Sequence, residues 1–165
     1  MEGPTIIIMY FPRCLGRSRI ETILIGVEMI KKKYGHRTIH DAQIQKLYLA
    51  AKAVAVPKVI SEQMCSGGVG AAVCTKQGRI FTGVCVDTDC SLGMCAERNA
   101  LCTMITAGEF DIDMVIAVNK NGKVLPPCGA CREFMGQFSH ANDIQVVVDN
   151  DGTVVHLRDL MPFPY

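Results

Sequence analysis

Three cysteines at the starts of two predicted helices constrain the fold of this 165-residue chain more than any other feature. Cys128 and Cys131 lie three positions apart in P-P-C-G-A-C-R-E, and Cys95 stands in M-C-A-E-R-N. A C-x-x-C pair is compatible with a redox centre, half of a structural zinc site or part of a catalytic zinc site. A redox pair stands alone in a thioredoxin-like context, and a structural zinc site needs a second pair, which this sequence lacks.

A catalytic zinc site accounts best for the surrounding residues. Cys95, Cys128 and Cys131 would supply three ligands, and the fourth position would stay open for water. Two helix N-termini directed at one ion would favour thiolate over thiol. Glu97 is predicted to act as general acid and base beside the metal, without binding it. Arg98 is predicted to offset the negative charge of the thiolates by hydrogen bonding to their sulfurs.

Composition narrows the choice of compartment and partner. The nine cysteines are an odd number, and no cleavable signal peptide is evident, which indicates a reducing cytosol with free thiols. The apolar run near the start stops at Pro12 and is too short to cross a membrane. A net charge of +1 gives no electrostatic footprint for nucleic acid. We therefore expect a cytoplasmic protein without a membrane or nucleic-acid partner.

Hydrophobic periodicity predicts an α/β fold. Helices are expected at 41–55, 95–107 and 129–138, with a further one after the last strand. Strands are expected at 69–75, 79–86, 113–119, 144–149 and 153–157, and a loop at 60–68. Strands that alternate with helices favour a central sheet covered on both faces. The turn signal N-D-G at 150–152 makes the last two strands antiparallel.

The first 36 residues differ in character from the rest of the chain. Residues 5–11 are β-prone, and residues 20–33 have the periodicity of an amphipathic helix that ends in three lysines. We find no chemistry in this segment. Residues 1–36 are therefore expected to be an N-terminal extension, and residues 37–165 the functional domain.

The motifs C-A-E and P-C-G-A-C-R resemble the signature of the zinc-dependent cytidine deaminase superfamily. The segments S-G-G-V-G-A-A-V, Q-G-R-I-F-T-G-V and D-L-M-P-F-P-Y also resemble family segments in the family's order, so the resemblance covers about residues 41–165. It implies a three-layer sandwich around a five-stranded mixed sheet whose last two strands are antiparallel. It also implies hydrolytic deamination with release of ammonia, with Zn²⁺ as the cofactor.

Three features favour the branch of the superfamily that acts on free nucleosides. The first ligand is Cys95, where many branches that act on nucleic acids, nucleotides or bases use histidine. The last two strands are predicted to be antiparallel, and the charge is close to neutral. The resemblance then implies cytidine or deoxycytidine as substrate, a role in pyrimidine salvage and a homotetramer. Tyr165 falls where the family has an aromatic residue that reaches a neighbouring subunit's pocket.

The implied substrate pocket departs from the family pattern. The usual sugar-binding stretch N-V-E is replaced by Cys85-Val86-Asp87, and the pocket phenylalanine by Gly67 or Gly68. The implied substrate contacts are Cys85, Asp87, Ala96 and Tyr165. The departures leave open another aminopyrimidine nucleoside, or an aminated heterocycle such as blasticidin S. A further alternative is a zinc-stabilised binding module without turnover, although such a module would not need Glu97.

The cysteines outside these motifs are expected to be ordinary core or loop thiols: Cys14, Cys65, Cys74, Cys90 and Cys102. Cys102 lies seven residues after Cys95, two helical turns along, and is expected to pack beneath the site.

Overall fold

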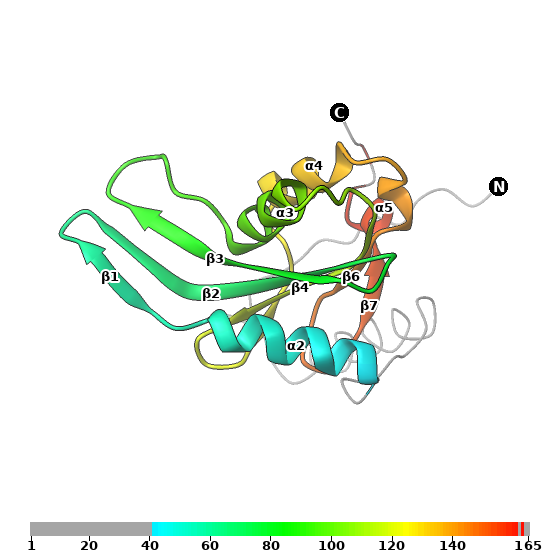
Figure 1. Ribbon diagram of the computed structural model, residues 1–165, viewed down its shortest axis with the longest axis horizontal. Helices are drawn as coiled ribbons and strands as arrows, with labels where there is room; N and C mark the ends of the chain where they lie inside the picture. Colours follow the sequence, from blue (N-terminus) through cyan, green and yellow to red (C-terminus); the bar gives the residue numbers. More distant parts are fainter. Residues whose placement is uncertain (1–40, 162, 164–165) are drawn as a thin grey trace, which may run out of the picture. The chain divides into compact units, whose positions relative to one another are not determined.

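The computed structural model describes residues 41–161 and residue 163, which form a mixed sheet between two layers of helices (Figure 1). Helix α2 (Ala42–Val54) covers one face. Helices α3 (Ala96–Thr106), α4 (Gly129–Gly136) and the short α5 (Leu157–Leu160) lie on the other, with a 3-10 turn η1 (Ala141–Asp143). The three longer helices begin and end within two residues of the predicted limits.

Five strands form the body of the sheet, in the order β3-β2-β4-β6-β7. Their bounds are β2 Met64–Thr75, β3 Ile80–Thr88, β4 Ile112–Asn119, β6 Gln145–Val147 and β7 Val154–His156. β2 is antiparallel to β3 and β4, and β6 is parallel to β4. β7 is antiparallel to β6, which confirms the predicted arrangement of the last two strands.

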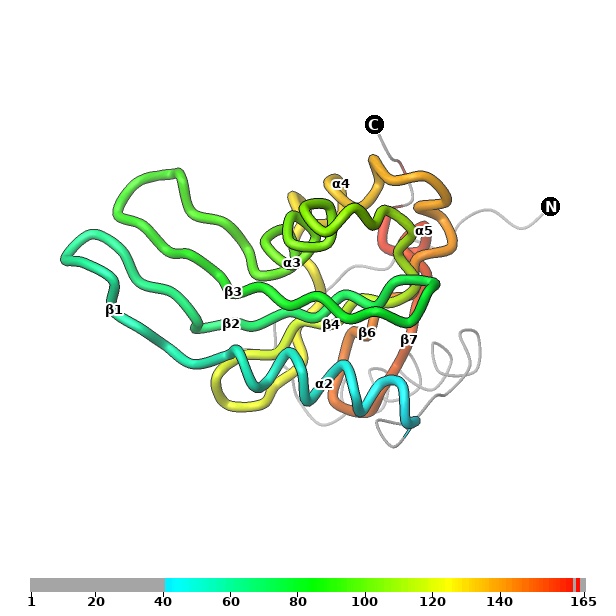
Figure 2. The backbone as a smooth tube through the Cα atoms, in the orientation of Figure 1, coloured from blue at the N-terminus to red at the C-terminus, as the bar shows by residue number. Residues whose placement is uncertain are grey.

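Two short strands add to this predicted set, so the described sheet has seven strands. β5 (Val124–Leu125) pairs with the end of β4, and β1 (Lys58–Ser61) pairs with the start of β2. The expected loop at 60–68 was therefore wrong: most of it belongs to a β1–β2 hairpin, drawn clearly in Figure 2. The glycine pair that suggested a loop lies inside β2, where the pairing with β3 shifts register between Ser66 and Gly70.

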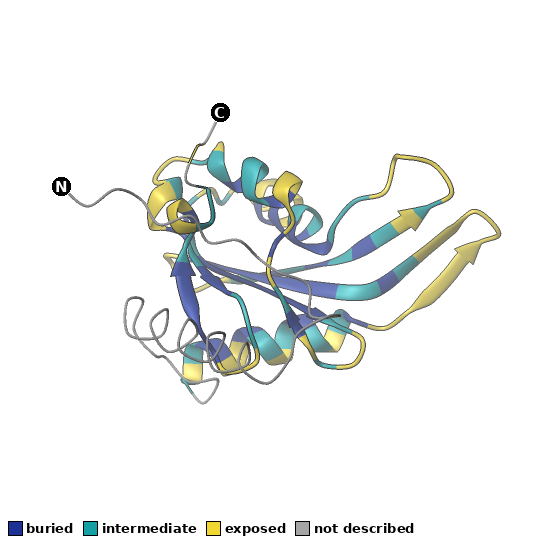
Figure 3. Cartoon of the chain, turned by 180° about the vertical axis from the view of Figure 1, so that it is seen from behind, coloured by how far each residue is buried: buried dark blue, intermediate teal, exposed yellow. Residues whose placement is uncertain are grey.

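The central strand β4 separates two hydrophobic cores. Val115 and Ala117 face the core under α3 and α4, whereas Met114, Ile116 and Val118 face the core under α2. Since both faces are covered, the strand is apolar from Met114 to Val118, as a buried strand should be. Figure 3 shows the resulting belt of buried residues along the middle of the sheet, in contrast to the exposed β1.

Helix α2 is held to its side of the sheet by an N-cap and by polar contacts. The Asp41 carboxylate accepts a hydrogen bond from the Gln43 backbone N–H at 3.0 Å. The Gln43 side chain donates to Asp113 at the start of β4 (2.7 Å). In the middle of the helix, the Tyr48 hydroxyl donates to the Gly122 carbonyl at 3.0 Å.

Helix α3 approaches β3 closely at Gly83. A Cβ atom at this position would lie 2.2 Å from the Ala100 backbone nitrogen, which no side chain can do. The side-chain amide of the preceding residue, Asn99, donates to the Val84 carbonyl at 3.0 Å. Glycine at 83 therefore sets the depth at which α3 sits on the sheet, and Asn99 sets its position along β3.

The predicted extension at 1–36 and the helix expected at 20–33 lie outside the described residues, so the division at residue 36 stays a prediction. Within the described residues, no helix is long and apolar enough to cross a membrane.

The contact at Gly83 predicts the effect of a single methyl group. Gly83→Ala should lower the free energy of unfolding by about 1–3 kcal/mol or more, because the backbone of α3 must move away. Gly136→Ala in α4 is the matched control, since its Cβ would meet only the Met161 side chain at ordinary contact distance. The control should be neutral or stabilising by about 0.5–1 kcal/mol. Urea denaturation measures both, and equal stabilities would contradict the proposed close approach.

Candidate active site

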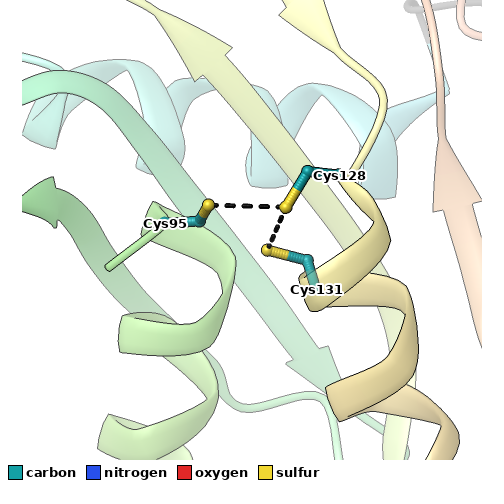
Figure 4. Close-up of side chains that lie close together, drawn as sticks. All are labelled: Cys95, Cys128 and Cys131. Atoms are coloured by element: carbon teal, nitrogen blue, oxygen red, sulfur yellow. Dashed lines mark hydrogen bonds between the residues drawn. The ribbon is translucent and has the colours of Figure 1, made fainter. Parts of the chain in front are cut away.

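The structure brings the three motif cysteines together at the starts of α3 and α4 (Figure 4). The Cys95 and Cys128 sulfurs are 3.5 Å apart, as are those of Cys128 and Cys131. All three sulfurs lie within 4.8 Å of one another. Two segments separated by more than thirty residues thus present their thiols to one point, as the sequence predicted.

The helix starts create this arrangement locally. Cys95 is the N-cap of α3 and Cys128 is the N-cap of α4, both with extended backbone (ψ 152° and 170°). Cys131 lies in the first turn of α4, so the C-x-x-C spacing returns its sulfur to that of Cys128. The N-terminal N–H groups of both helices therefore surround the cluster.

Arg132 was missed by the sequence analysis, although it directly follows the second motif cysteine. Its Nε donates to the Pro127 carbonyl at 2.8 Å, and its Nη1 donates to the Leu160 carbonyl at 3.1 Å. These bonds fasten the turn before Cys128 to helix α5. Arg132 therefore helps to hold the start of α4, and with it Cys128, in place.

The donor set fits a zinc ion. Sulfurs that each lie about 2.3 Å from one tetrahedral ion are about 3.8 Å apart, close to the observed separations. Thiolates are soft ligands that select zinc over magnesium or calcium. Among the described residues, the group of potential ligand atoms within this range consists of the three cysteines alone. Three protein ligands leave one position of a tetrahedron free.

The three thiols do not ionise equally. Burial opposes ionisation of Cys128, but hydrogen bonds from the Cys131 backbone N–H and thiol, with further help from Cys95, outweigh it and lower its pKa. Burial raises the pKa of Cys131 strongly, and the nearby charge of Glu97 adds to the effect. Burial and the Cys128 thiol likewise raise the pKa of Cys95. All three thiols can therefore ionise together only when a cation among the sulfurs stabilises the thiolates.

Glu97 lies beside the cluster in the first turn of α3 and is only 6% exposed. Burial raises the pKa of its carboxyl group, opposed by its own backbone N–H, the Cys131 thiol and the charge of Arg98. A buried carboxyl next to a potential metal site, but outside the group of ligand atoms, is suited to proton transfer.

Arg98 lies close enough to Glu97 to affect its pKa. Its Nε is buried without a hydrogen-bond partner among the described residues. The predicted hydrogen bonds to the thiol sulfurs are not formed in this structure. A buried guanidinium N–H without an acceptor is nevertheless a donor that a more negative cluster can use.

Strand β3 carries two of the predicted substrate contacts. The Cys85 thiol is buried and donates to the exposed Asp87 carboxylate at 3.4 Å. An antiparallel bridge between Val86 and Met94, with both N···O distances at 2.9 Å, places the end of β3 beside Cys95. Ala96 is buried in the same core cluster as Cys85, as the first residue of α3.

The remaining predicted positions are less closely connected to the cluster. Gly67 has φ +78°, and a Cβ there would lie 2.0 Å from the Val56 carbonyl oxygen, so this position cannot carry a phenylalanine. Tyr165 lies outside the described residues. Cys102 was wrongly expected to pack beneath the site: it is exposed, because the buried face of α3 is formed by Ala96, Glu97, Ala100, Leu101 and Met104.

Comparisons with known proteins agree with this geometry. The family model of the cytidine and deoxycytidylate deaminase zinc-binding region matches residues 42–148. A blasticidin-S deaminase of Bacillus cereus is 31% identical over 108 residues, which are 59% of this chain and 76% of that protein. A cytidine deaminase of Halalkalibacterium halodurans is 33% identical over 99 residues, 57% of this chain and 74% of that protein.

Solved structures give the same result. The crystal structure of cytidine deaminase from Mycobacterium leprae matches with a TM-score of 0.62 and 27% identity, over 74% of this chain and all of that one. The cytidine deaminase from Burkholderia pseudomallei matches with a TM-score of 0.61 and 30% identity, over 73% of this chain and 98% of that one. Since the family match also spans well over half of the chain, the protein belongs to the cytidine and deoxycytidylate deaminase family and is a hydrolase of the deaminase class.

Proposed function

We propose that the protein hydrolytically removes the exocyclic amino group of a free aminopyrimidine nucleoside, with cytidine and deoxycytidine as the first candidates. The products would be ammonia and uridine or deoxyuridine. The observation that carries the proposal is the buried Glu97 carboxyl beside three convergent thiols at two helix starts. A module that only bound zinc for stability would have no use for this carboxyl group.

Cys95, Cys128 and Cys131 would hold a zinc ion. When bound, zinc supplies a Lewis acid that makes water a stronger nucleophile at neutral pH. Glu97 accepts one proton from the attacking water and delivers it to the ring nitrogen. It then transfers the second proton of that water, from the new hydroxyl group, to the leaving amine. Its raised pKa suits this task, because the carboxyl group must hold the proton between the two transfers. Arg98 offsets part of the negative charge of the thiolates.

The substrate side would be formed by Cys85, Asp87 and Ala96, with Tyr165 supplied to the pocket of a neighbouring subunit. These residues follow from the family resemblance, and β3 leads to the cluster through the Val86–Met94 bridge. A blasticidin S-like heterocycle is the second candidate substrate. It is favoured by the relative named blasticidin-S deaminase and by the absence of the usual amide and phenylalanine from the pocket.

We further propose a homotetramer. Every residue of β1 is exposed, and Val59 reaches 85% exposure, so the β1–β2 hairpin offers apolar surface that an assembly would cover. Leu92, in the loop between β3 and α3, is 81% exposed. The family's arrangement, in which a C-terminal aromatic residue enters a neighbouring pocket, also requires more than one copy.

Metal analysis tests the ligand set. The purified protein should contain about one zinc ion per chain, and Cys128→Ala should lose the metal together with thermal stability, since thiolate–zinc bonds contribute folding free energy. Cys65→Ala, which removes an exposed thiol outside the cluster, is the matched control and should keep both. A folded Cys128→Ala protein that retained its zinc would disprove the assignment.

Ammonia release tests the function and the role of Glu97 together. The screen comprises cytidine, deoxycytidine, cytosine, blasticidin S and aminopurines. Glu97→Gln should lose about 10²–10⁴-fold in kcat or more, because the amide cannot carry the proton, while zinc content stays unchanged. Glu62→Gln, at an exposed turn, controls for the loss of one carboxylate. No release from any compound would reject the function, and loss of zinc from Glu97→Gln would make Glu97 a ligand.

The assembly can be measured by light scattering at micromolar concentration, where a tetramer is expected. Deleting residues 163–165 should reduce turnover more than zinc content, because the deletion removes the proposed contribution of Tyr165 to a neighbouring pocket. A monomer that is fully active would contradict both statements.

A further inference from the structure

We infer that Cys85 is a positioning residue, which holds the Asp87 carboxylate at the substrate side of the site and does not itself contact the substrate. Asp87 is then the group of this strand that recognises a hydrogen-bond donor on the substrate. The inference rests on the proposed function and refines it, because it assigns different tasks to two residues that sequence reasoning treated alike.

The Cys85 thiol has no hydrogen-bonding capacity to spare for a substrate. The Val69 backbone N–H donates to its sulfur at 3.2 Å, and the thiol donates to Asp87 Oδ2 at 3.4 Å. A thiol is a weak single donor and a weak acceptor, so both functions are in use. The side chain is also only 8% exposed. Its sulfur therefore links the Val69 backbone of β2 to the Asp87 side chain of β3.

The irregularity in β2 explains why an acceptor is needed at this point. The pairing of β2 with β3 passes from Ser66–Val86 to Gly70–Val84, so β2 holds two more residues than β3 in this interval. Gly67 adopts φ +78° within it. A bulge of this kind takes backbone groups out of the regular ladder. The Val69 N–H therefore donates to the Cys85 sulfur instead of to a strand carbonyl. A Cβ atom at Gly68 would lie 3.7 Å from the same sulfur.

The strand geometry places Asp87 on the same face of β3 as Cys85, near the end of the strand. Gly83, Cys85 and Asp87 alternate along β3 and therefore share one face. Gly83 lies against α3 at Ala100, and Asp87 lies two strand positions beyond Cys85, where a Cβ at Gly93 would come within 3.9 Å of its Cα. Asp87 is thus at the end of β3 that meets the segment leading into Cys95.

The exposed Asp87 carboxylate keeps most of its acceptor capacity. The Cys85 thiol is the one hydrogen-bond donor to Asp87 within the described residues. A carboxylate has about four acceptor sites on two oxygens, so it can also receive sugar hydroxyls or an ammonium group. Its negative charge repels a phosphate monoester. Within a family that includes deoxycytidylate deaminases, this group favours a nucleoside over a nucleotide.

Steady-state kinetics of four variants separate positioning from direct contact, with cytidine as the probe or, if the screen selects it, blasticidin S. Cys85→Ala should raise KM about tenfold and change kcat by no more than about twofold. The substitution releases the Asp87 carboxylate, which is remote from the reacting atoms, and leaves those atoms in place. Cys85→Ser, which keeps a donor and an acceptor, should restore most of the affinity. Asp87→Asn should raise KM at least as much. The double variant Cys85→Ala with Asp87→Asn should be no worse than Asp87→Asn alone.

Independent, multiplying effects of the two substitutions would overturn the inference, because they would mean that the thiol contacts the substrate itself. An Asp87→Asn enzyme with unchanged KM would overturn it as well. The unmodified enzyme should have a lower kcat/KM for deoxycytidylate than for deoxycytidine. In Asp87→Asn, the ratio of the deoxycytidylate value to the deoxycytidine value should rise. Cys102→Ala, which removes an exposed thiol from α3, is the control and should leave KM unchanged.

A readout without turnover keeps this inference separate from the proposed function. In the zinc-loaded protein, the ¹³C resonance of the Asp87 carboxyl and the hydrogen exchange of the Val69 amide report the two bonds of the thiol directly. Both should change in Cys85→Ala and stay close to the unmodified protein in Cys85→Ser. If neither changes in Cys85→Ala, the positioning role is wrong even in an active enzyme. If both change in a protein that releases no ammonia, the proposed function fails and the positioning role stands.

Discussion

The convergence of two helix starts over one sheet is the constraint on which the site depends. Cys95 and Cys128 are N-caps of different helices, so their sulfurs meet only if both helices have fixed depths and directions. Gly83 sets the depth of α3 by admitting its backbone against β3. Arg132 anchors the start of α4 through two backbone carbonyls. The arrangement of the cluster therefore depends on packing and backbone contacts at residues that are not part of the cluster.

The same convergence concentrates negative charge in a partly buried place. Burial opposes ionisation of Cys131 and raises its pKa, and negative charge on Glu97, Cys95 and Cys128 adds to the effect. A divalent cation relieves this repulsion, and helix N-termini assist it. Burial that raises the pKa of Glu97 works in the same direction as its proposed task, since a carboxyl group that shuttles a proton must be able to retain it. One structural arrangement would thus serve both the proposed metal binding and the proposed proton transfer.

The proposed substrate-binding side has a different structural basis from the proposed metal site. The bulge in β2 and the glycine pair within it leave this part of the strand without side chains and take a backbone N–H out of the ladder. Cys85 accepts that N–H and connects it to Asp87. The departure from the family's N-V-E pattern therefore belongs to one local rearrangement, in which strand irregularity and the residue at position 85 are linked.

The sequence by itself determined the order of the helices and of the five main strands, the antiparallel final pair and the three-cysteine motif. Periodicity, turn residues and ligand spacing are local properties. It misread 60–68 as a loop, since the glycine pair resembled a turn and the partner strands that hold β1 and β2 in place are remote. Only the tertiary structure decided that Cys102 faces solvent, that Arg132 supports the cluster and that Cys85 bonds to Val69. These depend on which elements come into contact, and packing, not local propensity, decides that.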